Sequence, residues 1–132
     1  MIENFILAAL AGSFLGLFSG MIPGLHTNTL AVLTVSLYRY FNLTPLEASI
    51  IISSMVSSHI FSSFIPAALL GAPDEDNSLS VLPAHKMLLA GRGLEAVFLM
   101  IAGAASALLL GSAIVFLSMK FFSNVYEVTR PY

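Results

Sequence analysis

Residues 12–29 read GSFLGLFSGMIPGLHTNT, and this stretch decides how the chain begins to fold. Its glycines recur every four residues, at Gly12, Gly16, Gly20 and Gly24. Residues four apart share one face of a helix, where small side chains let a second helix backbone approach closely. The Pro23-Gly24 pair then ends the helix, because proline lacks an amide donor and clashes with the preceding turn. The stretch therefore predicts a tightly packed helix followed by a break, with Gly12, Gly16 and Gly20 as its packing residues.

The composition is typical of a membrane protein. Hydrophobic residues make up 58% of the 132 positions and charged residues only 9%. Three tracts contain no Asp, Glu, Lys or Arg, at residues 4–38, 48–73 and 96–119. Each is longer than the roughly 20 apolar residues that cross a bilayer core. We therefore expect an all-α, polytopic integral membrane protein of the cell (plasma or inner) membrane, surrounded by membrane lipid.

The break at Pro23 falls inside the first charge-free tract. Lipid cannot satisfy open backbone groups, so non-helical chain at membrane depth is sheltered by protein or lines a wet cavity. The residues predicted to bind substrate here are Gly24, Leu25, His26, Thr27, Asn28 and Thr29. Unpaired amides at the start of the following helix favour an anion. In the alternative interpretation, Thr27 or Asn28 simply caps that helix.

Serines mark one face of the second charge-free tract. Ser54, Ser58 and Ser62 recur at four-residue spacing, and His59 lies beside them. Ionisable groups at membrane depth are expensive and usually functional, so Ser58, His59 and Ser62 are predicted to line a wet substrate pathway. In the alternative interpretation, the hydroxyls bond backbone carbonyls or bridge to another helix.

Helix-breaking and capping residues predict five helices within a single transmembrane domain, residues 1–132. Thr44-Pro45-Leu46-Glu47 has the spacing of a capping box, with proline at the first helical position. The expected helices cover residues 3–22, 27–41, 45–70, 82–90 and 94–122. The fourth is short and amphipathic.

Two segments of the chain carry a family resemblance. The first is Gly16-Leu-Phe-Ser-Gly20-Met-Ile-Pro23-Gly24-Leu25, and the second runs from Phe64-Ile-Pro66 through Gly71-Ala-Pro73 to Leu82-Pro83-Ala-His85 and Gly91-Arg92-Gly93. Together they resemble the large permease subunit of tripartite tricarboxylate transporters, the TctA family. The resemblance implies broken or re-entrant helices, transport of a small organic anion such as a carboxylate, and no enzymatic activity. Such permeases contain two inverted halves, whereas this chain has room for one repeat unit, which implies oligomerisation.

The turn after Pro73 departs from the family pattern. It carries Asp74, Glu75 and Asp76 where those permeases usually have small neutral residues. Carboxylate oxygens suit a hard cation, so the three residues are predicted to couple transport to Na⁺ or H⁺. A solvated interfacial loop is the alternative. No other cofactor and no catalytic or structural metal is expected.

The basic residues give only a weak orientation signal. If residues 27–41 cross the membrane, three basic residues (Arg39, Lys120 and Arg130) fall on one side and two (Lys86 and Arg92) on the other. Orientation follows Lys and Arg bias, and a difference of one barely specifies it. We therefore expect a homo-oligomer, either an antiparallel homodimer or a parallel oligomer of fixed orientation.

Several functions stay open at this point. The leading prediction is a permease that holds its substrate between two broken-helix tips, near Pro23–Thr29 and Pro73–Ser78. A polyprenyl-phosphate flippase is a more distant resemblance, because that family also uses a proline-glycine break in a glycine-rich hairpin. A non-transporting assembly subunit would use only the glycine face. An intramembrane enzyme is not expected, since no two histidines have metal-ligand spacing, and no basic run suggests nucleic acid.

Overall fold

The computed structural model describes residues 2–72 and 77–130, and every regular element in those ranges is a helix. The helices are α1 (Ile2–Gly20), α2 (Thr27–Leu37), α3 (Pro45–Leu70), α4 (Ser78–Leu89) and α5 (Gly93–Thr129). Among the described residues, α1, α3 and α5 are long and apolar enough to cross a membrane. The expected all-α class and the expected membrane-spanning character are thus confirmed.

The chain divides into two compact units, residues 1–100 and 101–132. The first unit contains α1 to α4 and the start of α5. The second unit consists of the remainder of α5, a continuous helix whose apolar side chains, such as Phe116, are exposed. Because lipid is as apolar as these side chains, their exposure is expected of a membrane-spanning helix.

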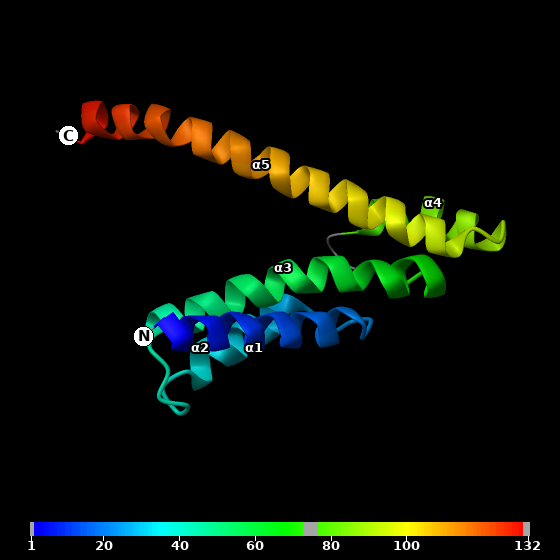
Figure 1. Ribbon diagram of the computed structural model, residues 1–132, viewed down its shortest axis with the longest axis horizontal. Coiled ribbons are helices and arrows are strands. Elements are labelled where there is room, and N and C mark those ends of the chain that lie inside the picture. Colours follow the sequence, from blue (N-terminus) through cyan, green and yellow to red (C-terminus); the bar gives the residue numbers. More distant parts are fainter. Residues whose placement is uncertain (1, 73–76, 131–132) are drawn as a thin grey trace. The chain divides into compact units, whose positions relative to one another are not determined.

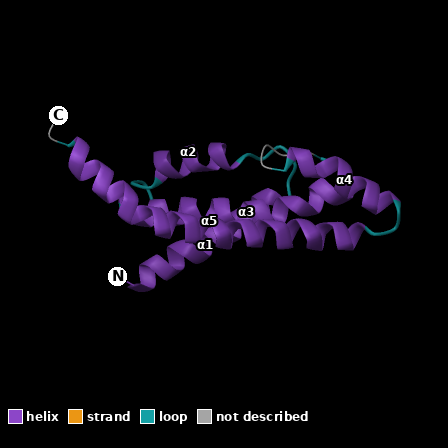
Figure 2. Ribbon diagram, turned by 90° about the horizontal axis from the view of Figure 1, so that it is seen from above, coloured by secondary structure: helices purple, strands orange, loops and turns teal. Residues whose placement is uncertain are grey.

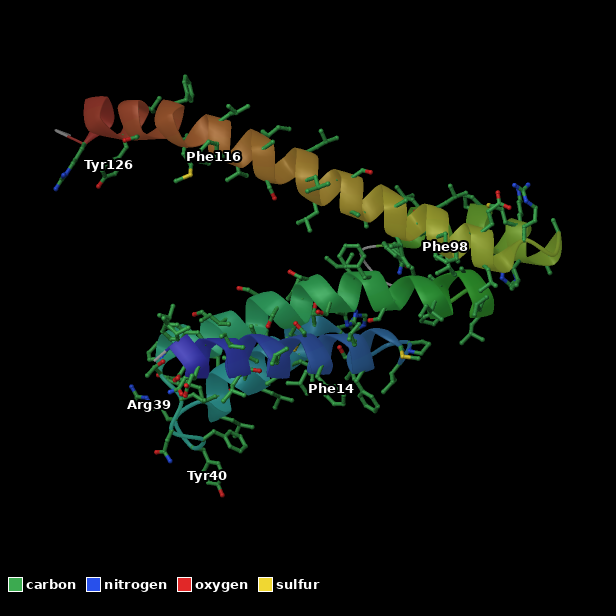
Figure 3. The ribbon with its side chains drawn as sticks, in the orientation of Figure 1. Phe14, Arg39, Tyr40, Phe98, Phe116 and Tyr126 are labelled. Carbon is green, nitrogen blue, oxygen red and sulfur yellow. The ribbon has the colours of Figure 1, made fainter. Side chains whose placement is uncertain are left out.

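Within the first unit, α1 lies along α3 and runs in the same direction (Figure 1). A Cβ atom added at Gly12, Gly16 or Gly20 would overlap the backbone carbonyl of Ile51, Met55 or His59, respectively. The contacts advance by four residues on both helices, which defines a parallel pair. Only glycine permits this approach, so the four-residue repeat is the reason that the two backbones touch. The opposite face of α1 carries exposed apolar residues such as Phe14 (Figure 3).

The chain reverses between α1 and α2 in a tight turn. The Leu25 amide donates to the Ile22 carbonyl at 3.2 Å, and Gly24 has a φ of 85°. Proline at the second position and a left-handed glycine at the third are the features of a type II turn. α2 then returns beside α3, so that both α1 and α2 contact α3 (Figure 2).

The ends of the first two helices differ slightly from the sequence expectation. α1 ends at Gly20 rather than at residue 22, because the Met21 and Ile22 amides bond to carbonyls three residues back, which tightens the last turn. The regular part of α2 ends at Leu37 rather than at residue 41. Its last turns continue to a left-handed Asn42, where the Leu43 amide bonds to Tyr38 and the Asn42 amide to Arg39. These two bonds form a Schellman motif, which stops the helix.

The last two helices are longer than expected. α4 begins at Ser78 rather than at residue 82, and Pro83 lies inside it. Val81 and Ala84 are both buried, so packing on either side of the proline keeps this segment helical. α5 continues to Thr129 rather than ending at residue 122, because residues 112–130 contain no glycine or proline to stop it.

The third helix has strong signals at both ends. The Thr44 hydroxyl accepts the Glu47 amide at 3.2 Å, and a Glu47 carboxylate oxygen accepts the Thr44 amide at 2.7 Å. This capping box satisfies two amides that the helix start leaves open. At the other end, Gly71 adopts a left-handed φ of 64° and closes the helix. Beyond it, α4 packs on α3 through a small cluster made by Ala68 and Ala84 together with Ala96 of α5.

Candidate functional site

A group of polar side chains is buried where α1, α3 and the start of α4 meet. The members of this polar cluster are Ser19, His59, Ser62, Ser63 and Asn77, each exposed by 5% or less. Three of them lie on a single turn of α3, in a helix that is otherwise apolar enough to cross a bilayer. Buried polar groups at membrane depth are costly, so a cluster of them points to a site.

The contact between Ser19 and His59 joins α1 to α3. Ser19 Oγ lies 2.9 Å from His59 Nδ1 and 3.2 Å from the Gly16 carbonyl oxygen. A hydroxyl carries one proton, so Ser19 donates either to the carbonyl or to the ring. The choice between these two acceptors decides whether Nδ1 of a neutral His59 ring accepts from Ser19 or donates to it. In the contact between Ser19 and His59, either side chain can therefore be the hydrogen-bond donor, with the other as the acceptor.

Ser58 and Ser62 lie against the glycines of α1. The Ser62 hydroxyl is within hydrogen-bond distance of the Gly16 carbonyl at 3.2 Å and of the His59 carbonyl at 3.1 Å. Ser58 packs where a Cβ on Gly16 would stand. Both predicted pathway serines thus lie at the α1–α3 interface, where bridging and close packing also account for them. Ser57, which directly precedes Ser58 on the same helix, is exposed and bonds only its own backbone, at the Ser53 carbonyl.

The predicted first tip is the turn and the beginning of α2. Gly24 is exposed, Leu25 is half-buried, and His26 occupies the N-cap position with an extended backbone. Thr27 and Asn28 therefore lie in the first turn of α2, and the expectation that one of them caps the helix was wrong. The capping position fell one residue earlier because the type II turn ends at Leu25.

The start of α2 retains the chemistry of an anion site. The His26 carbonyl accepts the Thr29 amide at 3.2 Å, and the His26 side chain makes no capping bond. The first-turn amides of Thr27 and Asn28 precede the first internal bond of the helix, so they point toward the break. A helix start of this kind attracts negative charge through these amides and the helix dipole.

The predicted ion-coupling residues Asp74, Glu75 and Asp76 lie outside the described residues. Their neighbour Asn77 is described, and its amide group donates to Ser63 Oγ at 3.2 Å. On α1, a Cβ at Gly20 would contact both Ser62 and Ser63. The chain before the first break and the chain after the acidic triplet thus reach the same turn of α3.

Sequence reasoning missed Ser19, Ser63 and Asn77 as members of the site. Ser19 adjoins Gly20 on the packing face, and Ser63 adjoins Ser62, so both were within one residue of a noted position. Asn77 lies within the predicted second tip, Pro73–Ser78, but was not predicted as a binding residue. The missing information was which helices meet, because a single serine or asparagine gives no sign of burial by itself.

The polar cluster is built from hydroxyl, amide and imidazole groups. No group of three or more His, Asp or Glu side chains that could hold a metal is found in residues 2–72 and 77–130. The described charged groups lie elsewhere: Arg92 Nε donates to Glu95 Oε2 at 2.7 Å on the protein surface. That hydrogen bond raises the pKa of the Arg92 guanidinium above its ordinary value. The cluster is therefore suited to hydrogen-bonding a polar ligand.

These features define a class, an all-helical membrane protein with buried polar groups beside a helix break. A family model described as the tripartite tricarboxylate transporter TctA family matches residues 6–132, and the chain belongs to that family. It is therefore a membrane protein of a transporter family, as the two sequence segments predicted.

A relative with a curated sequence extends this comparison. The uncharacterized protein MJ1079 of Methanocaldococcus jannaschii is 38% identical over 94 residues, which cover 71% of this chain and 23% of the relative. The chain thus spans less than a quarter of the length of the curated relative that it matches. No solved structure matches the chain.

Proposed function

We propose that this chain is one repeat unit of a carrier that moves a small organic anion, such as a carboxylate, across the cell membrane. The observation that carries the proposal is the polar cluster around His59, buried between helices that are long enough to cross a bilayer. Membership of a transporter family supports the same class of activity. Carriers commonly bind their substrates at such interrupted, sheltered helices.

In this proposal the substrate site consists of the α2 start together with the turn of α3 that carries His59. The Gly24–Thr29 segment supplies backbone amides and the side chains of Thr27 and Asn28, which bind the anionic group. His59 and the serines Ser58 and Ser62 contribute hydrogen bonds from α3. The close approach of Gly20 to Ser62 and Ser63 supports a common site for the two segments.

Transport is coupled to Na⁺ or H⁺ in this proposal, and Asp74, Glu75 and Asp76 are the coupling residues. Their carboxylates are the oxygen ligands that a hard cation prefers. The hydrogen bond from the adjacent Asn77 to Ser63 supports a link between this segment and the α3 turn. Movement of one helix group against another then alternates access to the site.

The working carrier is an oligomer. The chain matches only 23% of its relative, so a complete pathway needs further protein. Additional copies of this chain supply it in the proposal, and an antiparallel homodimer would reproduce an inverted repeat. In this arrangement the exposed apolar face of α5 contacts lipid or another copy.

Uptake by proteoliposomes tests the proposal. Radiolabelled citrate-like acids should accumulate with the wild-type chain under a Na⁺ or H⁺ gradient. His59→Ala and the pair Thr27→Ala/Asn28→Ala should each lower uptake by about tenfold or more, since a buried hydrogen bond to a charged ligand contributes about 1.5–3 kcal/mol. Ser57→Ala is the matched control on α3, because its side chain is exposed and bonds only its own helix. Full uptake by both site variants would reject the substrate site.

A second candidate is a non-transporting assembly subunit, although the glycine face that it would use is already packed on α3 within this chain. It predicts that the site variants behave like wild type. A polyprenyl-phosphate flippase would instead restore recycling of the lipid carrier and leave carboxylate uptake at background. Asp74→Asn/Asp76→Asn with unchanged ion dependence would reject the coupling assignment and leave the substrate site standing.

A further inference from the structure

An apolar groove runs between α2 and the packed helices α1 and α3. Leu33 and Leu37 of α2 and Leu15 of α1 line its sides, and Ile51 and Met55 of α3 form its floor. The floor residues are 7% and 0% exposed, whereas Leu33 and Leu37 are 49% and 44% exposed. The members of the polar cluster are not among its lining residues. The groove is therefore a separate feature of the first unit.

The side chains that line the groove are mostly apolar. Thr34 lines it, but its hydroxyl donates to the Leu30 carbonyl of the same helix at 2.8 Å. From Leu30 to Leu37 the groove follows α2 for about 10 Å, at 1.5 Å per residue. An elongated, apolar ligand segment suits such a surface.

A cation lies at one end of the groove. Tyr38 lines that end, and Arg39 Nε donates to its hydroxyl at 3.1 Å. The Arg39 guanidinium also lies 5.8 Å from the Tyr38 ring centroid, so it is held on a groove residue. In the part of the chain that the structure describes, no carboxylate forms an ion pair with Arg39. Figure 3 shows Arg39 and Tyr40 at the turn between α2 and α3.

We propose that this groove binds one acyl chain of an anionic phospholipid, whose phosphate pairs with Arg39. The acyl chain lies along Leu33 and Leu37 in place of the other lipid tails of the membrane. The Arg39 guanidinium, which is charged at any physiological pH, binds the phosphate oxygens in a bidentate manner. Tyrosine and arginine side chains are typical of the headgroup level of a bilayer, which fits the position of the groove end. The proposal is independent of the transported substrate.

Single-tryptophan reporters can test the groove, because the chain contains no tryptophan. Phe41→Trp places a fluorophore in the groove lining, and Phe98→Trp places one at an exposed position on α5 that does not line it. Each reporter, as purified full-length protein in neutral detergent, is titrated with phosphatidylglycerol or phosphatidylcholine carrying the same brominated acyl chains. Bromine quenches tryptophan only at close range.

The expected result is about fivefold tighter half-saturation by phosphatidylglycerol than by phosphatidylcholine at the Phe41→Trp reporter, the effect of one basic group near anionic lipid. Arg39→Gln should abolish this preference. Arg92→Gln, which removes the same charge at an exposed residue paired with Glu95, should leave it intact. The Phe98→Trp reporter should respond equally to both lipids.

Three outcomes would overturn the proposal. The first is equal quenching of the Phe41→Trp reporter by both lipids. The second is a preference that survives Arg39→Gln, or one that Arg92→Gln removes equally. The third is a Phe41→Trp fluorescence that brominated lipid does not quench and that instead changes with protein concentration. That result would indicate that a second copy of the chain occupies the groove. Circular dichroism of each variant verifies that its helices are intact.

Discussion

Glycine serves two different purposes at the residue scale of this chain. At Gly12, Gly16 and Gly20 the backbone is helical, and the absence of a side chain lets α3 approach. At Gly24 nothing lies within 4 Å of an added Cβ, but the φ of 85° is one that residues with side chains rarely adopt. The first three positions are therefore limited by space and the fourth by backbone conformation, and a substitution acts differently at each.

Gly16→Ala should destabilise the α1–α3 pair by about 1–3 kcal/mol, the usual cost of overpacking, because its Cβ would overlap the Met55 carbonyl. Gly103→Ala is the matched control, since it is a helical glycine with open space around it. That substitution should be neutral or stabilise by roughly 0.5–1 kcal/mol, because alanine is the better helix former. Thermal unfolding in detergent, followed by circular dichroism, measures both. Equal effects at the two positions would contradict the packing role.

At the scale of single elements, α2 is too short to cross a bilayer alone. Its 11 residues extend about 16 Å, against a hydrocarbon core about 30 Å thick. The type II turn, the short helix and the Schellman motif at Asn42 instead return the chain to the beginning of α3. α3 then starts with a full capping box. The start of α3 is therefore set by its own residues, whereas the burial of its side chains depends on α1.

The capping box of α3 should be measurable. Thr44→Ala removes the hydroxyl that accepts the Glu47 amide and should cost about 1 kcal/mol of stability. Thr44→Ser, which keeps an accepting hydroxyl, should restore most of the loss. The same unfolding experiment distinguishes them. If alanine and serine behave alike, the capping bond does not contribute to stability.

At the scale of the whole molecule, the position of the break relative to the lipid is the decisive property. The chain contains no cysteine, so single cysteines can be placed freely. In lipid vesicles, the carrier proposal predicts that Asn28→Cys reacts with a membrane-impermeant maleimide much more slowly than Tyr40→Cys, because the proposal shelters the break at membrane depth, whereas Tyr40 is 82% exposed at a helix turn. Mass spectrometry of the labelled protein gives both rates.

Equal labelling of the two cysteines would remove the basis of the carrier proposal.

The same labelling experiment also reports the orientation of the chain in the membrane. In an antiparallel homodimer, the Tyr40→Cys protein should be labelled to about half from outside the vesicles and to completion after they are opened, because the weak charge bias permits both orientations. A single orientation would favour a parallel oligomer.

Several features of the fold could be predicted from the sequence because their causes are local. The charge-free tracts predicted the apolar helices, since the length of such a tract alone decides whether it can cross a bilayer. Pro23, Gly24 and the Thr44–Glu47 spacing predicted where helices stop and start, since each acts within one turn of chain. The start of α4 was less predictable, because Val81 and Ala84 hold a proline-containing segment helical through their burial.

The sequence by itself determined that this chain is a helical membrane protein with a glycine face and a break, and its two motif segments identified the family. Only the tertiary structure decided that the glycine face meets α3 in parallel. It also decided that Ser19 lies beside His59, 40 residues along the chain. A four-residue repeat specifies one face of one helix, whereas the partner of that face depends on contacts between distant residues. For this reason the polar cluster emerged only when α1, α3 and the start of α4 were brought together.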